Sequence, residues 1–448
     1  MALMISVSGI RGIFGTDLNP ENLARFTAAY GTWAGGGTIV VGRDSRVTGE
    51  LCERVVTAAL QSVGCRVISA GIVPTPTVAM GVLRHNAAGG IVISASHNPA
   101  QWNALKLLNS RSEFLDAEQG ARVMEIANSA GGPAYVGFDA IGQVEHDDDL
   151  ADWHIQQILN LPYIRPEVIA GKNFRVAVDA VNGAGSLVVP KLLSKLGVTA
   201  VDTIHCTPDG LFPHNPEPLP EHLADICQLV QERGSDLGVV VDPDADRLAL
   251  VDEHGRLIGE EYTLPAAVDF HLEKKPGDIA VNLSSSRISE DIARKYGVTC
   301  HRSAVGEINV VKKMQETGAV ISGEGNGGVI NPDLHPGRDA LVGIAMVLQM
   351  LAERDTTLGA YRESLPSYFI LKSKVELGSV NADEVLRKVT EIYKNEKITT
   401  IDGVKIDFDN GWVHLRKSNT EPIIRVYSEA RSAQEARDLA EPIMNQLR

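Results

Sequence analysis

The sequence has few cysteines, few aromatic residues and no excess of basic residues. None of the five cysteines in the 448 residues belongs to a CxxC pair, so neither a disulfide framework nor a cysteine-zinc site is indicated. A reducing compartment fits this cysteine usage. Lys and Arg number 42 against 57 Asp and Glu, a formal net charge of −15, so we expect no nucleic-acid partner.

The sequence also lacks a long apolar run. No stretch approaches the roughly 20 apolar residues of a membrane span. Residues 1–7 are apolar, but they are followed closely by Arg11 and do not resemble a signal peptide. We therefore expect a cytoplasmic protein with no membrane partner. The share of hydrophobic residues, 44%, is typical of a globular chain.

Short β-branched runs alternate with helical patterns along most of the chain. This alternation predicts an α/β fold of βαβ units on largely parallel sheets. The predicted strands are residues 38–41, 90–93, 174–178, 237–241 and 279–283. The pattern restarts twice, which suggests three related mixed α/β domains over residues 1–153, 154–257 and 258–363. A polar segment follows each predicted strand, where such sheets usually bind ligands.

Residues 364–448 have a different pattern, which predicts a C-terminal α+β domain. Two predicted strands, residues 398–408 and 412–415, flank an Asn410-Gly411 pair, which is a strong hairpin signal. Helical patterns over residues 383–395 and 433–447 lie on either side of this hairpin.

A polar segment, Ser94-Ala95-Ser96-His97-Asn98-Pro99, follows the second predicted strand. It presents the Ser96 hydroxyl and the His97 imidazole at a strand end, where a serine can be a nucleophile if a base or a metal activates it. The alternative is a polar turn that caps the next helix. A hydrolase is not favoured, because no G-x-S-x-G elbow surrounds Ser96.

Three carboxylates at alternate positions, Asp242, Asp244 and Asp246, follow the predicted strand 237–241. In a curved loop they can converge, and three hard oxygen ligands suit a magnesium-type cation. A calcium loop of the EF-hand type is rejected, because Arg247 stands where that loop needs a glycine. A phosphatase with an aspartyl nucleophile remains a rival, since a D-x-D at a strand end can form an aspartyl phosphate.

Two further segments could bind parts of a sugar phosphate. Residues 322–328 are rich in glycine, and Glu324 and Asn326 could hold neighbouring sugar hydroxyls, although a turn with nothing bound is as plausible. The spacing of a nucleotide-binding loop is absent from this segment. Arg416 and Arg425 bracket the donors that a phosphate dianion requires, with a solvated hairpin loop as the alternative. Those donors are Ser418, Asn419 and Thr420.

These four loops, in this order, resemble those of the α-D-phosphohexomutase superfamily. The match begins at Ser8-Gly9-Ile10-Arg11-Gly12 and ends at the loop between the two arginines. The resemblance implies four domains around a central cleft and a hinge near residue 364. It implies an isomerase that moves a phosphate between O6 and O1 of a hexose. The cofactors it implies are Mg²⁺ and a hexose 1,6-bisphosphate, the intermediate and activator.

The resemblance also implies roles for individual residues. Ser96 carries the phosphoryl group and, with the three aspartates, binds Mg²⁺, and Arg247 lies beside this metal loop. Lys106 matches a lysine that assists proton transfer, and it could serve as the base if nearby cations and partial burial lower its pKa. We also expect His97 to be one of the catalytic residues, with Ser96, Lys106 and Arg247. The residues expected to bind substrate are Arg11, Glu324, Asn326, Arg416, Ser418, Asn419, Thr420 and Arg425.

Two details bear on the substrate. Many members of the superfamily have a histidine where this chain has Gly328, and His335 is a candidate to replace it only because it is near in sequence. The loops are most similar to those of phosphoglucosamine mutases, with phosphomannomutase or phosphoglucomutase activity as the alternative. A magnesium-dependent sugar phosphatase and a non-catalytic sugar-phosphate sensor are further rivals. We expect a monomer or a homodimer and a small phosphosugar as the partner.

Overall fold

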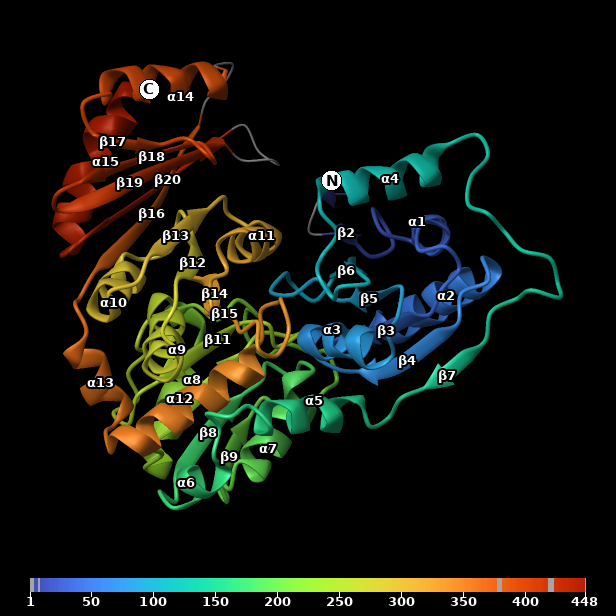
Figure 1. Cartoon of the computed structure of the whole chain (residues 1–448), viewed down its shortest axis with the longest axis horizontal. Coiled ribbons are helices and arrows are strands. Elements are labelled where there is room, and N and C mark those ends of the chain that lie inside the picture. The colour runs from blue at the N-terminus through green and yellow to red at the C-terminus, as the bar shows by residue number, and fades with distance from the viewer. Residues whose placement is uncertain (1–3, 7–8, 377–380, 418–422, 448) are drawn as a thin grey trace.

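The computed structural model describes residues 4–6, 9–376, 381–417 and 423–447. Their strands form four sheets that follow one another along the chain and define domains I to IV (Figure 1). Domain I has a mixed sheet in the order β1-β2-β6-β5-β3-β4-β7. Its elements are β1 Met4–Ser6, β2 Gly9–Ile13, α1 Pro20–Trp33, β3 Ile39–Arg43, α2 Gly49–Ser62, β4 Val67–Ile72, α3 Thr75–Arg84, β5 Gly89–Ile93, β6 Trp102–Asn109, α4 Ala117–Asn128 and β7 Val144–His146.

Helices cover both faces of the domain I sheet, which explains why its central strands are continuous apolar runs. Ile91 and Ile93 of β5 belong to the core formed with α1 and α2, whereas Val92 belongs to the core formed with α3. Alternate side chains of one strand therefore enter two different cores.

Domains II and III have four-stranded sheets in the orders β11-β10-β8-β9 and β13-β12-β14-β15. The elements of domain II are α5 Leu150–Leu159, α6 Pro166–Ala170, β8 Arg175–Asp179, α7 Gly185–Lys195, β9 Ala200–Ile204, the 3₁₀ turn Pro220–His222, α8 Ala224–Arg233, β10 Leu237–Val241 and β11 Leu248–Val251. Those of domain III are α9 Glu260–Lys274, β12 Ile279–Asn282, α10 Ile288–Tyr296, β13 Cys300–Ser303, α11 Glu307–Thr317, β14 Ile321–Glu324, β15 Gly328–Ile330, α12 Ala340–Arg354 and α13 Leu358–Ser364.

The first three domains share one four-stranded unit. If the four strands of each unit are numbered in sequence, all three units have the order 4-3-1-2. These units are β6-β5-β3-β4, β11-β10-β8-β9 and β15-β14-β12-β13. In each unit the first three strands are parallel and the fourth is antiparallel to the third. The turn between the third and fourth strands therefore occupies the same topological position in all three domains. It holds the Ser96 segment, the Asp242 to Asp246 segment and the glycine-rich segment.

Domain IV has an antiparallel sheet in the order β16-β20-β19-β18-β17. Its elements are β16 Phe369–Glu376, α14 Ala382–Ile392, β17 Lys397–Thr399, β18 Val404–Phe408, β19 Gly411–Lys417, β20 Ile423–Ala430 and α15 Ala433–Leu447. The predicted hairpin is confirmed, with Phe408 paired to Gly411. The single strand predicted over residues 398–408 is wrong. Gly403, at φ +70°, lies in a turn that splits this stretch into two antiparallel strands.

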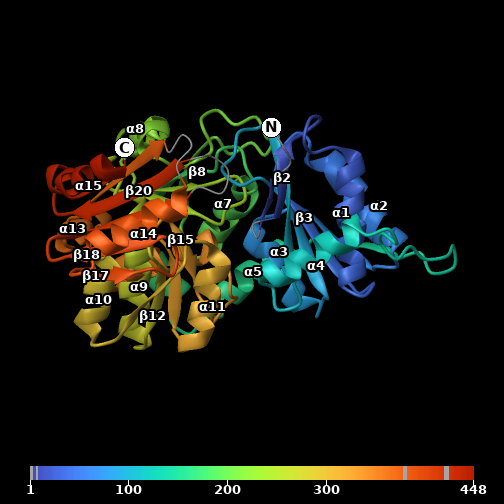
Figure 2. The same cartoon turned by 90° about the horizontal axis from the view of Figure 1, so that it is seen from above.

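Domains II and III form one body, because the buried helix α12 joins them in a single hydrophobic core. Domain IV has a separate core. Domain I, in blue, and domain IV, in red, lie on different sides of this central body in both views (Figures 1 and 2). Within the described part of the chain, no helix is both long and apolar enough to cross a lipid bilayer.

Candidate active site

Ser96 lies against the acidic segment of domain II. Its Oγ donates a hydrogen bond of 2.8 Å to Asp242 Oδ2, although the two residues are 146 positions apart. Ser96 is buried and has a φ of +49°, a left-handed conformation that non-glycine residues rarely adopt. Such local strain is maintained only where surrounding contacts hold it.

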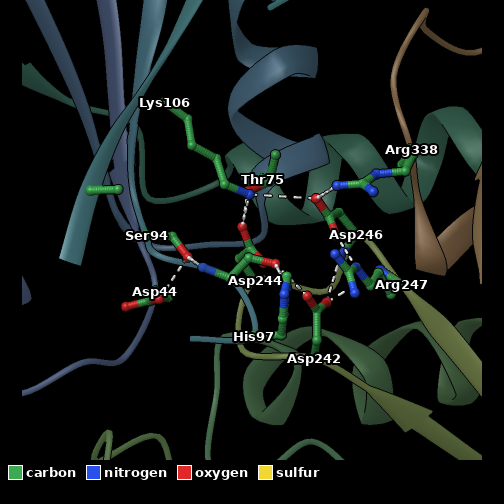
Figure 3. A network of polar contacts seen from close by, with 12 residues as sticks. Asp44, Thr75, Ser94, His97, Lys106, Asp242, Asp244, Asp246, Arg247 and Arg338 are labelled. Carbon is green, nitrogen blue, oxygen red and sulfur yellow. Dashed lines mark hydrogen bonds and ion pairs between the residues drawn. The ribbon is translucent and has the colours of Figure 1, made fainter. Parts of the chain in front are cut away.

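The buried Arg46 supplies those contacts. Its guanidinium donates hydrogen bonds to four backbone carbonyls of the serine segment: those of Ser96, Asn98, Pro99 and Trp102. Asp44 accepts from the Ser94 hydroxyl (Figure 3) and from Arg46. The Ser94 hydroxyl in turn accepts from the Ser96 amide. This supporting role was not predicted from the sequence. The sequence offered one signal for it: the polar segment after the predicted strand 38–41 contains a second arginine, Arg46, three residues after Arg43.

The three aspartates converge as the sequence predicted. One oxygen from each lies within 4.8 Å of the others, and all three residues are fully buried. Ala245, at φ +49°, makes the sharp turn between Asp244 and Asp246. Burial and the two neighbouring carboxylates raise the pKa of Asp242 well above its usual value.

Two buried carboxylate oxygens of this cluster have no hydrogen-bond donor. No described residue donates to Asp244 Oδ1 or Asp246 Oδ1. Hard oxygen donors that are buried, crowded and unpaired fit a small divalent cation. The acidic segment is therefore a metal-capable site at the point where the Ser96 hydroxyl arrives.

Lys106 contacts the same aspartates from the domain I side (Figure 3). Its Nζ lies 2.5 Å from Asp244 Oδ2 and 3.4 Å from Asp246 Oδ2. Burial lowers the pKa of Lys106, but the two carboxylates have the larger combined effect and raise it. The condition for Lys106 to act as a base, a lowered pKa, is therefore not met in this arrangement, because the effect of the two carboxylates outweighs those of burial and Arg338.

His97, Arg11 and Arg247 surround the serine. His97 Nδ1 lies 3.4 Å from Ser96 Oγ. Burial, followed by the charges of Arg247 and Arg11, lowers the pKa of His97 to about 2, so its imidazole is neutral. Arg11 donates a 2.6 Å hydrogen bond to Asn98 Oδ1, and the Arg247 amide donates to Asp242 Oδ1 at 3.2 Å.

Arg338 joins the metal-capable cluster to the glycine-rich segment. It donates hydrogen bonds of 2.7 Å to Asp246 Oδ2 and 3.0 Å to Glu324 Oε2. Asn326 contributes a buried Oδ1 that accepts no hydrogen bond from the described residues. Arg338 was not predicted as a site residue, since nothing in its local sequence distinguishes it from other arginines.

Arg338 also occupies the space above Gly328. A Cβ added at Gly328 would lie 2.2 Å from Arg338 Cδ, so a larger side chain would collide with the arginine. Arg338, and not His335, thus fills the place where many superfamily members have a histidine. His335 is buried elsewhere, with Nε2 3.4 Å from Asp339 Oδ2.

In domain IV, Arg416 and Arg425 are direct cross-strand partners on β19 and β20. Arg416 pairs with Asp402 at 2.8 Å, and Arg425 is exposed. The other predicted phosphate ligands, Ser418, Asn419 and Thr420, lie outside the described residues. Among the described residues, no hydrogen bond or ion pair joins these arginines to the first three loops. Contacts thus unite three of the four predicted loops.

Comparison with known families agrees with this fold and site. Alpha/beta/alpha domains I, II and III of phosphoglucomutase/phosphomannomutase match residues 3–131, 152–255 and 259–369, and the C-terminal domain of the same proteins matches residues 371–446. The fold and the site define a phosphosugar mutase with a serine beside an acidic, metal-capable cluster. The chain belongs to the phosphoglucomutase/phosphomannomutase family. The predicted superfamily and the predicted enzyme class, an isomerase, are confirmed.

Individual relatives cover nearly the whole chain. A probable phosphoglucosamine mutase of Methanopyrus kandleri is 35% identical, over 100% of this chain and 98% of its own. A phosphoglucomutase/phosphomannomutase of Thermococcus kodakarensis is 37% identical, over 98% and 97%. The crystal structure of a phosphoglucomutase/phosphomannomutase family protein from Burkholderia thailandensis superposes with a TM-score of 0.86 at 26% identity, over 99% and 97% of the two chains.

Proposed function

We propose that this enzyme interconverts the 6-phosphate and 1-phosphate of glucosamine through a phosphoserine at Ser96 and a hexose 1,6-bisphosphate. The observation that carries the proposal is the 2.8 Å contact between Ser96 Oγ and Asp242 Oδ2, beside two buried carboxylate oxygens without donors. A hydroxyl in this position can carry a phosphoryl group that faces a bound cation.

Asp242, Asp244 and Asp246 would hold Mg²⁺ together with a phosphoserine oxygen. When bound, the ion neutralises charge on the transferring phosphoryl group. Asp244 Oδ1 and Asp246 Oδ1 support this assignment, because they are buried, accept no hydrogen bond from the described residues and so have lone pairs available to a cation. Lys106 and Arg338 hold the other oxygen of each carboxylate and so orient both groups.

Ser96 acts as a phosphoryl carrier in both directions. Its P–O bond breaks as a new P–O bond forms to the sugar hydroxyl, which produces the bisphosphate and returns a proton to Ser96. After the sugar turns over, its other phosphate moves to Ser96 in the same way. Lys106 stays protonated between its two carboxylate partners, so we assign it the positioning of Asp244 and Asp246 and not the role of the base. The neutral His97 imidazole, with Nδ1 3.4 Å from Ser96 Oγ, is positioned to exchange a proton with the hydroxyl.

The phosphate that does not react needs a separate cationic site, because a single metal-capable cluster cannot serve both ends of the bisphosphate. Arg416 and Arg425, together with Ser418, Asn419 and Thr420, are our proposal for that site. Glu324 and Asn326 would hold sugar hydroxyls between the two ends, and the unpaired Asn326 Oδ1 is free to accept one.

The phosphoserine is tested by replacing Ser96. We expect the Ser96→Ala protein to incorporate no label from a ³²P-labelled sugar bisphosphate and to lose mutase activity by more than about 10³-fold. The exposed Ser110→Ala variant of the same domain is the matched control and should behave as the wild type. Undiminished turnover in Ser96→Ala would rule out the nucleophile assignment.

The choice of sugar rests on the names of relatives. The Methanopyrus kandleri protein is named a probable phosphoglucosamine mutase, whereas the name of the Thermococcus kodakarensis protein refers to glucose and mannose phosphates. Side-by-side assays on the 6- and 1-phosphates of glucosamine, mannose and glucose decide the question, with the highest kcat/KM expected for glucosamine. A phosphate-release assay separates a mutase, which releases almost none, from the rival sugar phosphatase.

A further inference from the structure

A second cluster of metal-ligating side chains lies in domain II, outside the proposed active site. Asp179 ends β8, His205 follows β9 directly, and His214 comes from the loop beyond it. His205 Nδ1 and His214 Nε2 lie 3.0 and 3.2 Å from the same oxygen, Asp179 Oδ2. Asp179 is buried, whereas 16% and 13% of the two histidine side chains are exposed, so an ion can reach the cluster from solvent.

The outer nitrogens of both imidazoles already face hydrogen-bond acceptors. His214 Nδ1 lies 2.8 Å from the carbonyl of Asn215, which requires a proton on that nitrogen. His205 Nε2 lies 3.5 Å from Asp225 Oδ2, which favours a proton there as well. When each ring is neutral, its inner nitrogen directs a lone pair toward the Asp179 carboxylate. The three atoms lie within 4.8 Å of one another, so a divalent cation can replace the protons that otherwise lie between them.

We propose that Asp179, His205 and His214 bind a divalent cation of the zinc type at a site separate from the acidic cluster. Two imidazoles and one carboxylate are ligands that zinc prefers, whereas the all-oxygen cluster of the active site suits magnesium. Bond lengths of about 2.0–2.1 Å imply ligand separations of about 3.3 Å in a tetrahedron, close to the 3.0 and 3.2 Å between the two imidazole nitrogens and Asp179 Oδ2. Water from the exposed side would complete the coordination.

Outer-sphere contacts of the kind found at zinc sites are present for all three ligands. Asn215 and Asp225 hold the two rings, and Asp179 Oδ1 accepts a 2.9 Å hydrogen bond from the Val181 amide. These contacts set the orientation of each ligand before an ion arrives.

The site would fix a loop that supports the active site. Phe212, two residues before His214, has its ring 4.9 Å below the guanidinium carbon of Arg46, the residue that holds the Ser96 segment. The turn after Asp179 packs on the metal-capable segment, where the Ala184 amide donates a 2.8 Å hydrogen bond to the Pro243 carbonyl. A cation bound to Asp179 would therefore restrain both the loop that packs on Arg46 and the turn that packs on the metal-capable segment.

Cobalt spectroscopy tests the proposal on the full-length protein. Metal-free wild type is titrated with Co²⁺ in excess Mg²⁺, which occupies the acidic cluster. We expect one equivalent of cobalt to give the strong visible absorption of a tetrahedral site with nitrogen ligands, and one equivalent of Zn²⁺ to abolish it. Absence of this absorption in the wild type would overturn the proposal without any variant.

Variants then locate the ion. His205→Asn should lose the absorption, and asparagine tolerates the left-handed φ of +49° at this position. Asp244→Asn, in the acidic cluster, should keep it. Asp225→Asn changes an exposed residue that is not a ligand and should weaken cobalt binding about 10- to 100-fold. Equal absorption in the wild type and in a folded His205→Asn protein would also overturn the proposal. None of these readouts depends on mutase activity.

Discussion

Arg338 illustrates how one side chain connects two parts of the site. It is a cation with only 10% of its side chain exposed, between Asp246, in the metal-capable cluster, and Glu324, in the glycine-rich segment. Glu307 also lies 3.0 Å from its Nε, and burial raises the pKa of Glu307 to about 7. Breaking a buried ion pair leaves uncompensated charge, so this arginine is costly to remove.

Replacing Arg338 should therefore change both stability and metal binding. We expect Arg338→Met to lower the free energy of unfolding by about 2–4 kcal/mol and kcat/KM by about 100-fold, with partial rescue in Arg338→Lys. Loss of its positive charge should also raise the affinity for Mg²⁺, an effect that a purely structural residue would not produce. Urea unfolding, steady-state kinetics and calorimetric Mg²⁺ titration measure the three effects.

The exposed Arg54→Met variant on α2 is the matched control and should leave all three quantities unchanged. Unchanged Mg²⁺ affinity in a folded Arg338→Met protein would contradict the electrostatic role.

At the scale of secondary structure elements, three cations form a row across the domain IV sheet. Lys374 on β16 pairs with Arg425 on β20, which pairs with Arg416 on β19, so the three side chains share one face. Like charges directly opposite each other on neighbouring strands are destabilising. Their presence is explained if the row binds an anion, and this adds Lys374 to the proposed phosphate site.

Removal of one cation from the row should weaken substrate binding more than turnover. We expect Arg425→Ala to raise KM more than about 10-fold while kcat changes less, and Lys374→Ala to have a smaller effect in the same direction. Neither variant should lower the melting temperature. Kinetics at several salt concentrations, with the exposed Lys388→Ala on α14 as control, test this expectation. An unchanged KM in Arg425→Ala would contradict it.

A buried lysine on β18, Lys405, should make the stability of the protein depend on pH. Burial, together with the nearby charge of Arg302, lowers the pKa of Lys405 to about 8, although its Nζ lies 3.2 Å from Asp407 Oδ1. The pKa is lower in the folded state than in the unfolded chain, where it is about 10.4. Between these values the unfolded chain binds more protons, so this residue makes the protein more stable as pH rises.

Urea unfolding of the wild type and Lys405→Met from pH 7 to 10 measures that contribution. The stability difference between the two proteins should shift in favour of the wild type above pH 8, by at most about 1.4 kcal/mol per pH unit. At pH 7 the methionine variant should be the more stable one. A difference that does not vary with pH would show that Lys405 has an ordinary pKa.

At the scale of the whole molecule, domains that share a hydrophobic core move together, whereas a domain with a separate core can move relative to them. Domains II and III share one core, whereas domain IV has its own and meets domain III through polar contacts. These include Ser284 with His414 at 2.9 Å, the Arg287 amide with Glu429 at 3.0 Å, and the Val305 amide with Asp402 at 2.9 Å. A few exchangeable hydrogen bonds can rearrange more easily than a hydrophobic core.

We therefore predict that domain IV closes toward domain I when both ends of a sugar bisphosphate are bound. The radius of gyration measured by X-ray scattering should decrease on addition of the bisphosphate, because the arginines of domain IV and the serine segment of domain I then hold the same molecule. Arg425→Ala should show less compaction at the same concentration. No decrease in the wild type at saturation would contradict closure.

The amino-acid sequence by itself determined the features that depend on neighbouring residues. Apolar runs followed by polar turns indicated the strands and three of the segments that meet at the site, and the Asn410-Gly411 pair indicated its hairpin. The turn at Gly403 was missed, because a glycine among β-forming residues also fits a continuous strand.

Only the tertiary structure decided which charges face one another. It brought Asp244 to Lys106, which raises the pKa of the lysine where a base would need a lowered one, and placed Arg338 over Gly328. It also made Arg46 the support of the Ser96 segment. These partners come from segments far apart in the sequence or in different loops and, in the first case, from different domains. Electrostatic energy depends on distance in space, and a linear sequence does not specify that distance for residues far apart in the chain.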